Sequence, residues 1–401
     1  MIRAALILLV TLVVFALGRS PVFRVDRAGI AVIGAALAVG TGVLTFDEAM
    51  RFVDPRTLMI LFSMMIVTAE LKLSGFFDLA GRWMLRRARS RGALLLWVTL
   101  VSGVLSAFCI NDIVCLLFTP VVLGACARAR LNPVPYLLAV ALASNIGSAA
   151  TLVGNPQNIL IAGLSGMSFG TYFLRAAPLA LLGLGLTFLA LKWRYRSDLT
   201  GTLPADVAGS APVHAYLAGK GVLVLGAVIA GFSLGADMAV TAMLGGAALL
   251  VTRRVNPNKI YASVDFNLLV IFAGLFVIIG GVEKSGLMDW VLGRLGGFDF
   301  HSLPVFAALT VVFSNLFSNV PAVLLLKYLV PAAGSPPWWT ALALFSTLAG
   351  NLTLVGSIAN LIVAEIARKQ GVRLGFFEYL KVGLPLTLIL CAASGVYLRF
   401  L

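Results

Sequence analysis

Long apolar runs and short polar interruptions alternate along the whole chain. Each run approaches the length that a helix needs to cross a bilayer, and none shows the strict alternation of a half-exposed strand. The pattern therefore predicts an all-α, polytopic membrane protein. The plain spanning helices are expected over roughly residues 2–17, 28–44, 56–71, 173–193, 217–233, 237–252 and 377–400, with one more directly after Asp265.

Two apolar stretches carry polar residues near their middle and are predicted to form re-entrant hairpins. The first covers residues 92–126 and turns at Cys109-Ile110-Asn111-Asp112, and the second covers residues 302–330 and turns at Ser318-Asn319-Val320-Pro321. Each arm is near the lower length limit for a full span. We therefore expect both polar tips to lie inside the membrane.

Two further stretches, residues 135–164 and 338–364, share one internal motif. Both contain Thr-Leu-Val-Gly-x-x-x-Asn, starting at Thr151 and at Thr353, and both carry an asparagine upstream, Asn145 and Asn351. Gly, Pro and Asn free backbone groups that lipid cannot satisfy, so these stretches are predicted to be broken helices. Paired interruptions at matching places in two halves point to the binding site of a transporter.

The order of elements divides the chain into two repeats of inverted topology. In each repeat, scaffold helices precede a capped helix, an amphipathic segment, a hairpin, a broken helix and a last helix, which gives about ten spans in all. We predict scaffold helices at 1–54, transport elements at 55–196, a polar linker at 197–216, scaffold helices at 217–263 and transport elements at 264–401.

Composition and charge support a membrane protein. Hydrophobic residues make up 60% of the chain and charged residues 11%, and the net charge is +14. Lys and Arg lie in short loops between apolar runs, which is the positive-inside pattern and argues against nucleic-acid binding. We expect a multi-pass protein of the plasma (inner) membrane with both termini outside. No phosphate-binding loop and no catalytic pair are found, so neither an ATP-driven pump chain nor an enzyme is predicted.

A site in the middle of the membrane must satisfy an ion without bulk water. The N-terminal end of a half-helix suits an anion, its C-terminal end suits Na⁺, and Asn, Ser and Thr side chains complete either shell. Alternatively, these side chains only cap broken helices. The candidate substrate- or ion-binding residues are Asn111, Asp112, Asn145, Ser148, Thr151, Asn155, Ser318, Asn319, Asn351, Thr353 and Ser357. No metal site is predicted.

Asp112 is the one carboxylate expected at a hairpin tip deep in the membrane. An acid there is costly to keep charged and is a functional candidate by default, here for proton coupling. The alternative is that Asp112 caps the second arm of a shallow hairpin. Lys327 either reaches the outer surface or serves as a substrate countercharge. The motifs themselves contain no Arg or Lys, which favours a neutral substrate or an anion held by helix dipoles.

These motifs resemble a known group. Residues 144–158 look like the broken-helix motif of the ion transporter superfamily, and Asn111-Asp112 with Thr119-Pro120 resembles the first hairpin of its arsenite-permease branch. Residues 350–360 and Ser318-Asn319-Val320-Pro321 resemble the second-half counterparts. The resemblance implies an elevator-type carrier, often a homodimer, with Asn111, Asn155, Asn319, Thr353 and Ser357 at the site. The dicarboxylate symporters of this group carry Ser-Asn-Thr at both hairpin tips, and this chain lacks both threonines.

The sequence therefore predicts a secondary transporter of a small anion or oxyanion, coupled to protons and without other cofactors. Arsenite or antimonite is the leading substrate, and an ATPase partner subunit is expected only for an arsenite pump. Two alternatives stay open within the superfamily, a Na⁺/H⁺ antiporter and a Na⁺-coupled symporter of dicarboxylates or inorganic anions. A channel or a non-transporting scaffold fits less well, because the polar residues cluster instead of lining a continuous pore.

Overall fold

The computed structural model describes residues 1–20, 22–203, 213–252, 254–294, 299–300, 302–331 and 335–400. In these ranges the chain is helical and contains no β-strand, as the apolar pattern predicts. Six helices are long and apolar enough to cross a bilayer, and the bent pair of α3 and α4 makes a seventh; several shorter apolar helices accompany them. A multi-pass helical protein is confirmed, and the count of ten spans stays a prediction.

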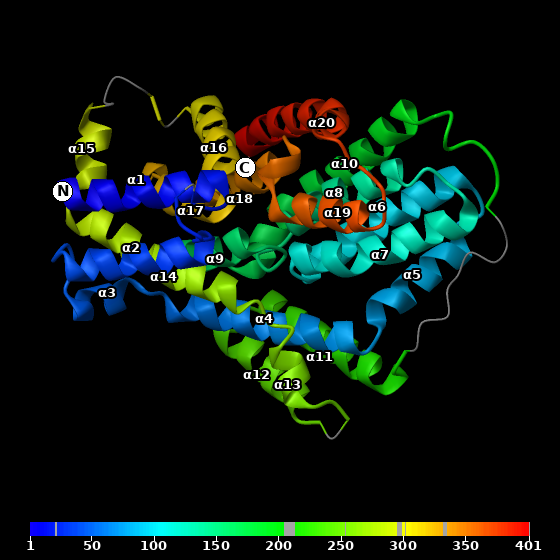
Figure 1. Ribbon diagram of the computed structural model, residues 1–401, viewed down its shortest axis with the longest axis horizontal. Helices are drawn as coiled ribbons and strands as arrows, with labels where there is room; N and C mark the ends of the chain where they lie inside the picture. Colours follow the sequence, from blue (N-terminus) through cyan, green and yellow to red (C-terminus); the bar gives the residue numbers. More distant parts are fainter. Residues whose placement is uncertain are drawn as a thin grey trace.

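The two halves of the chain run through the same order of helices (Figure 1). The first half contains α1 (Ile2–Leu17), α2 (Arg27–Gly40), α3 (Phe46–Phe52), α4 (Pro55–Leu73), α5 (Phe76–Arg87), α6 (Arg91–Phe108), α7 (Asn111–Ala129), α8 (Val134–Ser148), α9 (Pro156–Ser165) and α10 (Phe169–Arg194). The second half contains α11 (Ala215–Ser233), α12 (Met238–Leu250), α13 (Pro257–Tyr261), α14 (Phe266–Lys284), α15 (Leu287–Arg294), α16 (Leu303–Phe317), α17 (Asn319–Leu326), α18 (Ser335–Ala349), α19 (Ile358–Lys369) and α20 (Phe376–Tyr397).

Equivalent helices of the two halves begin for the same local reasons. Asp54 caps α4 by accepting hydrogen bonds from the Arg56 and Thr57 amides, and Asp265 caps α14 through the Leu268 amide at 3.2 Å. The short amphipathic helices α5 and α15 each follow a glycine with positive φ. Part of the predicted linker 197–216 lies outside the described residues.

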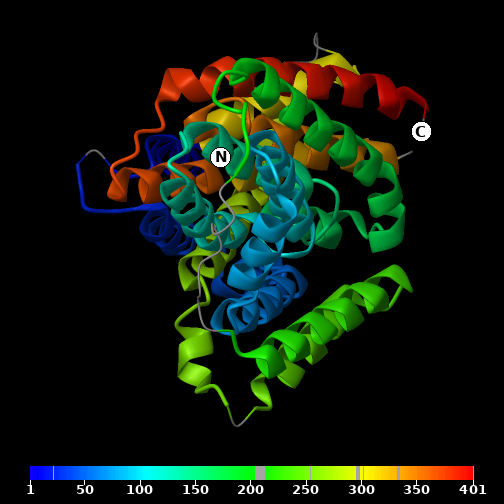
Figure 2. The same ribbon diagram turned by 90° about the vertical axis from the view of Figure 1, so that its right-hand side faces the viewer.

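In each half, one helix packs along a long helix of the other half. Helix α2 packs along α14, and its equivalent α12 packs along α4. Glycines permit both close approaches, because a Cβ at Gly274 would lie 2.6 Å from the Ala31 carbonyl oxygen and a Cβ at Gly246 would contact Ser63. Helices α4 and α14 run in opposite directions in Figure 1, and α11 to α13 form one edge of the molecule, whereas α10 and α20 form the other (Figure 2).

The predicted hairpins and broken helices each form a pair of helices, of which α6 and α7 are long enough to cross a bilayer. Helices α6 and α7 meet at residues 109–110, and α16 meets α17 at Ser318, each at the expected tip. Helix α8 ends at Ser148 before α9 begins at Pro156, and α18 ends at Ala349 before α19 begins at Ile358. Backbones of α6 and α8 nearly touch, because a Cβ at Gly147 would lie 2.0 Å from the Gly103 carbonyl oxygen.

Candidate functional site: a cavity between two hairpin tips and two helix breaks

Four short helices begin at one cavity. Its wall contains the first residues of α7 and α17, from the hairpin tips, and of α9 and α19, from the second parts of the broken helices. Helices α1, α2 and α14 close the remaining side. Together the walls enclose about 540 Å³ of space free of atoms, the mouth included. The polar lining residues are Arg27, Asn111, Asp112, Gln157, Ser318, Asn319 and Ser357.

The arrangement of these helices gives the cavity a positive electrostatic character. Each helix N-terminus carries a partial positive charge from its unpaired N–H groups and its macrodipole. Here four of them converge, since α7, α9, α17 and α19 all start at the cavity wall. Their dipoles favour an anion or the electron-rich oxygens of a polar ligand.

A chain of buried amides fixes which atom the site presents to a ligand. Its far end is anchored on backbone carbonyls. Asn351 Nδ2 donates to the Leu142 carbonyl at 3.0 Å, and Asn360 Nδ2 donates to the Gly350 carbonyl at 2.7 Å. Because carbonyls only accept hydrogen bonds, each of these amides must turn its oxygen the other way.

Asn145 links this anchor to the first hairpin tip. Its Nδ2 donates to Asn351 Oδ1 at 2.9 Å and to Asn360 Oδ1 at 3.0 Å. Its Oδ1 then accepts from Asn111 Nδ2 at 2.9 Å and from Ser357 Oγ at 3.1 Å. The orientation of Asn111 follows, so its Oδ1, which is buried and has no hydrogen-bond partner among the described residues, is left as a free acceptor.

The second hairpin tip carries a similar free acceptor. Asn319 Oδ1 is buried, lines the cavity and has no hydrogen-bond partner in the described part of the chain. The preceding residue, Ser318, has φ 75° and ψ 158°, a conformation that belongs essentially to glycine. Such backbone strain persists only where the surrounding structure enforces it. Two unpartnered amide oxygens and a strained tip therefore mark this cavity as a ligand site.

In the second half, Thr347 forms hydrogen bonds to several polar side chains, as Asn145 does in the first half. Its Oγ1 accepts from Asn155 Nδ2 at 3.2 Å and from Gln157 Nε2 at 3.3 Å, and it lies 3.3 Å from Asn158 Oδ1. In the first half, Asn145 similarly contacts Ser357 and Asn360. Thr347 and Asn145 both lie six residues before the threonine of the shared motif. Both motifs do follow an asparagine, but Asn351 lies two residues before its motif threonine, so Thr347 and not Asn351 occupies the position equivalent to Asn145.

The two motif threonines hold the helix breaks against the hairpins instead of lining the cavity. Thr151 donates its hydroxyl to the Ala107 carbonyl of α6, and Thr353 donates to Asn315 Oδ1 of α16 at 3.1 Å. The motif glycine Gly154 is required by space, since a Cβ there would lie 2.4 Å from the Ser148 carbonyl oxygen. Each hairpin is thereby tied to the break of its own half.

The two charged residues of the cavity come from opposite walls. Asp112 lies in the first turn of α7, half-buried, and its carboxylate accepts no hydrogen bond from any described residue. It does not cap the helix, because the N-cap position is Ile110. Arg27 is the first residue of α2, and its Nε donates to the Phe15 carbonyl at 3.2 Å. Lys327 takes no part in the site, since it pairs with Glu283 at 3.3 Å.

The structure brings the predicted residues together in two layers, and their role in binding stays a prediction. Of the eleven predicted residues, the cavity is lined by Asn111, Asp112, Ser318, Asn319 and Ser357. The supporting network behind it contains Asn145, Ser148, Thr151, Asn155, Asn351 and Thr353. The residues missed are Arg27, Gln157, Asn158, Thr347 and Asn360. Alignment of the two motifs at their threonines would have found Thr347.

Comparisons with known proteins agree on transport. The sequence profile of the citrate transporter family (CitMHS) matches residues 7–344. An uncharacterised transporter of Mycobacterium tuberculosis is 30% identical over 94% of both chains. The silicon efflux transporter LSI3 of rice is 31% identical over 93% of this chain and 92% of its own. The solved YdaH transporter of Alcanivorax borkumensis has a similar fold, with a TM-score of 0.60 at 18% identity, covering 99% of this chain and 96% of that chain.

Proposed function

The chain belongs to the citrate transporter family, and we propose that it is a proton-coupled secondary transporter of a small oxyanion or hydroxy acid, with arsenite as the leading case. Membership of this family confirms the resemblance to the ion transporter superfamily and identifies a transporter, not an enzyme. The protein is integral to the membrane and crosses it several times. Substrate, coupling ion and mechanism are the parts that we propose.

One observation carries the choice of substrate class. The cavity offers two free amide oxygens, Asn111 Oδ1 and Asn319 Oδ1, among four helix N-termini. The amide oxygens require a ligand that donates hydrogen bonds, whereas the helix ends favour electron-rich oxygen atoms. Arsenous acid and silicic acid meet both demands, because each carries several O–H groups on one small centre. The rice relative, named for silicon efflux, is consistent with this class.

Asp112 is the proposed coupling residue. Its carboxylate lines the same cavity as the proposed substrate and forms no ion pair with a described residue. The positive groups around this cavity are the helix N-termini and Arg27. Proton uptake removes a charge from a poorly hydrated place and favours movement through the membrane. We propose that protonation and substrate occupancy of this one cavity are linked, which couples transport to the pH gradient.

The mechanism that we propose is an elevator. Close backbone contact between α6 and α8, together with the bond from Thr151 to α6, joins the first hairpin to its broken helix. The two broken helices are joined through Asn145 and Thr347. Hairpins and broken helices would move as one body against the paired helices α2, α14, α4 and α12. The sequence grouped α4 and α14 with the transport elements at 55–196 and 264–401; because they pack along α12 and α2, we propose to group them with the scaffold instead. A homodimer remains our expectation.

Cation transport is the second candidate, and the same two oxygens favour it. Asn111 Oδ1 and Asn319 Oδ1 are also suitable ligands for Na⁺, and the Asp112 carboxylate would complete such a site. A Na⁺/H⁺ antiporter would move Na⁺ against protons without any anion. A Na⁺-coupled dicarboxylate symporter would instead need Na⁺ for anion uptake.

The test is transport in proteoliposomes with an imposed pH gradient, using radiolabelled arsenite, a dicarboxylate and Na⁺ in parallel. We expect arsenite flux that follows the gradient, and we expect Asp112→Asn to abolish this dependence on pH while the protein stays folded. Asp78→Asn, in α5 and outside the cavity, is the matched control and should behave like the wild type. Na⁺ flux without arsenite or dicarboxylate flux would establish the antiporter instead.

A further inference from the structure

A second cavity lies against the scaffold at a place equivalent to the substrate cavity. It is lined by Arg56 and Ile60 of α4, Phe232 of α11, Met238 at the start of α12, and the end of α9. The substrate cavity has the matching scaffold wall, with Ile271 of α14, Phe15 of α1 and the start of α2. Ile60 and Ile271 lie six residues after the helix-capping Asp54 and Asp265.

The helices α2 and α12 align without a gap, which makes the comparison specific to single residues. Both begin after an aspartate N-cap and read Asp-x-Ala-x-x-Ala-x-x-Gly, from Asp26 to Gly34 and from Asp237 to Gly245. The alanines of this pattern are buried in both helices. In this alignment Arg27 and Met238 occupy the same position, and each lines its own cavity.

The two cavities therefore differ in charge. Arg27 forms no ion pair within the described ranges, and its single hydrogen bond, from Nε to the Phe15 carbonyl, leaves the two terminal nitrogens of the guanidinium available. In the second cavity Arg56 is neutralised, because its Nη1 lies 3.1 Å from Asp237 Oδ2. A hydrogen bond from the Val240 amide, and then the charge of Arg56, hold the pKa of Asp237 below its usual value, so the pair is ionic.

We propose that Arg27 donates charge-assisted hydrogen bonds to the substrate oxygens only when the site lies against α2, which gives the two faces of the membrane unequal affinities for an oxyanion or its neutral acid. The inference rests on the proposed elevator function. In an inverted repeat, the second transport state is obtained when each repeat takes the conformation of the other. In that state the hairpin tips would lie at the Met238 cavity instead of the Arg27 cavity. There the substrate meets a thioether and an internally neutralised ion pair, and the guanidinium contact is lost.

Affinity measured separately from each face is the direct test. Half-saturation for radiolabelled arsenite is determined in right-side-out and inside-out vesicles. We expect Arg27→Met to raise the half-saturation concentration about tenfold at one face, because one charge-assisted hydrogen bond is lost there. The half-saturation concentration at the other face should not change. Arg27→Lys should retain most of the affinity. Met238→Arg should lower the half-saturation concentration at the opposite face.

Two outcomes overturn the role of Arg27. One is an equal change at both faces in Arg27→Met, which would mean that the side chain only supports the fold. The other is no change at either face. Complete absence of arsenite, silicic acid and citrate flux in the wild type would contradict the proposed function instead, which keeps the two failures distinct.

A cross-link tests the second docking place without any substrate. Asp112 and Ile271 line the substrate cavity together, so the exchange of repeats predicts that Val320 and Ile60, at the equivalent positions, approach each other in the other state. In a variant whose four native cysteines are replaced, Ile60→Cys with Val320→Cys should be joined by a short bifunctional reagent. Ile60→Cys with Leu174→Cys, which is exposed on α10, is the control. Failure of the first pair to cross-link would overturn the inference.

Discussion

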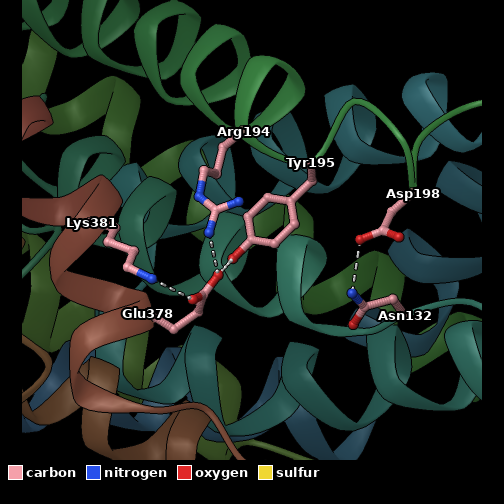
Figure 3. Close-up of polar contacts among 6 residues, drawn as sticks. All are labelled: Asn132, Arg194, Tyr195, Asp198, Glu378 and Lys381. Carbon is pink, nitrogen blue, oxygen red and sulfur yellow. Dashed lines mark hydrogen bonds and ion pairs between the residues drawn. The ribbon is translucent and has the colours of Figure 1, made fainter.

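Two polar clusters join the first half of the chain to the second, and they use different chemistry. The buried cluster around Asn145 consists of amides and hydroxyls, and none of its members carries a charge. At the ends of α10 and α20, Glu378 accepts a hydrogen bond from Tyr195 and lies near Arg194 and Lys381 (Figure 3). The three charged side chains of that ion-pair cluster are 30–59% exposed, whereas Tyr195 is buried.

The difference follows from the medium around each cluster. Charges in a water-poor interior are costly unless every one is paired, whereas neutral amides can be satisfied completely by one another. At the solvated ends of helices, ions keep much of their hydration, and their pairing contributes little. The neutral cluster is therefore expected to determine the stability of the site, and the ion-pair cluster to have a minor effect.

The largest effect is expected from Asn145→Leu. The change leaves Asn111 Nδ2, Ser357 Oγ and two asparagine oxygens without their partner, at about 1–3 kcal/mol for each group that stays buried. We expect a loss of more than about 3 kcal/mol in unfolding free energy and no transport. Thermal unfolding in detergent, with flux in proteoliposomes, provides the measurement.

The same substitution at Asn132 serves as the control. Asn132 Nδ2 donates to Asp198 Oδ2 at 2.9 Å (Figure 3), and its Oδ1 accepts from the Val134 amide at 3.1 Å; both bonds are exposed. Because water replaces the lost partner, Asn132→Leu should cost less than about 1 kcal/mol. Equal destabilisation by the two variants would contradict the distinction between the clusters.

A smaller effect is expected from Thr347→Val, which removes one hydroxyl and keeps the shape of the side chain. Asn155 and Gln157 then lose a buried acceptor, so the unfolding free energy should fall by about 1–3 kcal/mol. The control is Thr187→Val in α10, whose hydroxyl bonds only the Gly183 carbonyl one turn earlier. That variant should unfold within about 1 kcal/mol of the wild type, and a larger loss than in Thr347→Val would refute the assignment.

The smallest effect is expected from Glu378→Gln in the ion-pair cluster. Arg194 lies 3.5 Å from the carboxylate and Lys381 3.8 Å, both partly in water, so the change should stay within about 1 kcal/mol. The difference from the wild type should shrink further at high ionic strength. Unfolding at low and high salt measures both, and a large effect that salt does not change would show that this cluster is structurally important.

The elements were predictable because membrane helices leave a strong local signal. Helix α1 begins and ends where its apolar run does, and both hairpin tips lie at the polar interruptions. Site residues next to these interruptions, such as Asn111 and Asn319, were found for the same reason. Arg27 was not, because it precedes an ordinary apolar helix and reaches the cavity only through packing of α1, α2 and α14.

The hydrogen bonds of the amide network cannot be predicted from short segments of the sequence. Which atom of the Asn111 amide is left free depends on the Leu142 and Gly350 carbonyls, which orient Asn351 and Asn360 and through them Asn145. Alignment of the two motifs marks Thr347 as the counterpart of Asn145, but its contacts with Asn155 and Gln157 follow only from the packing of α18 against α9. The chain order therefore predicts the place of the site, and three-dimensional contacts determine its chemistry.

The bond between Asn145 and Asn351 spans 206 residues, which has a consequence for biosynthesis. When the ribosome has delivered the first half to the membrane, Asn145 already lies in its helix, but its partners have not yet been translated. The nascent half holds an unsatisfied amide until α18 and α19 arrive, and the binding cavity forms only at that moment. Two separately expressed halves, each inserted in the bilayer, should therefore associate, because these amides satisfy one another only when the halves meet.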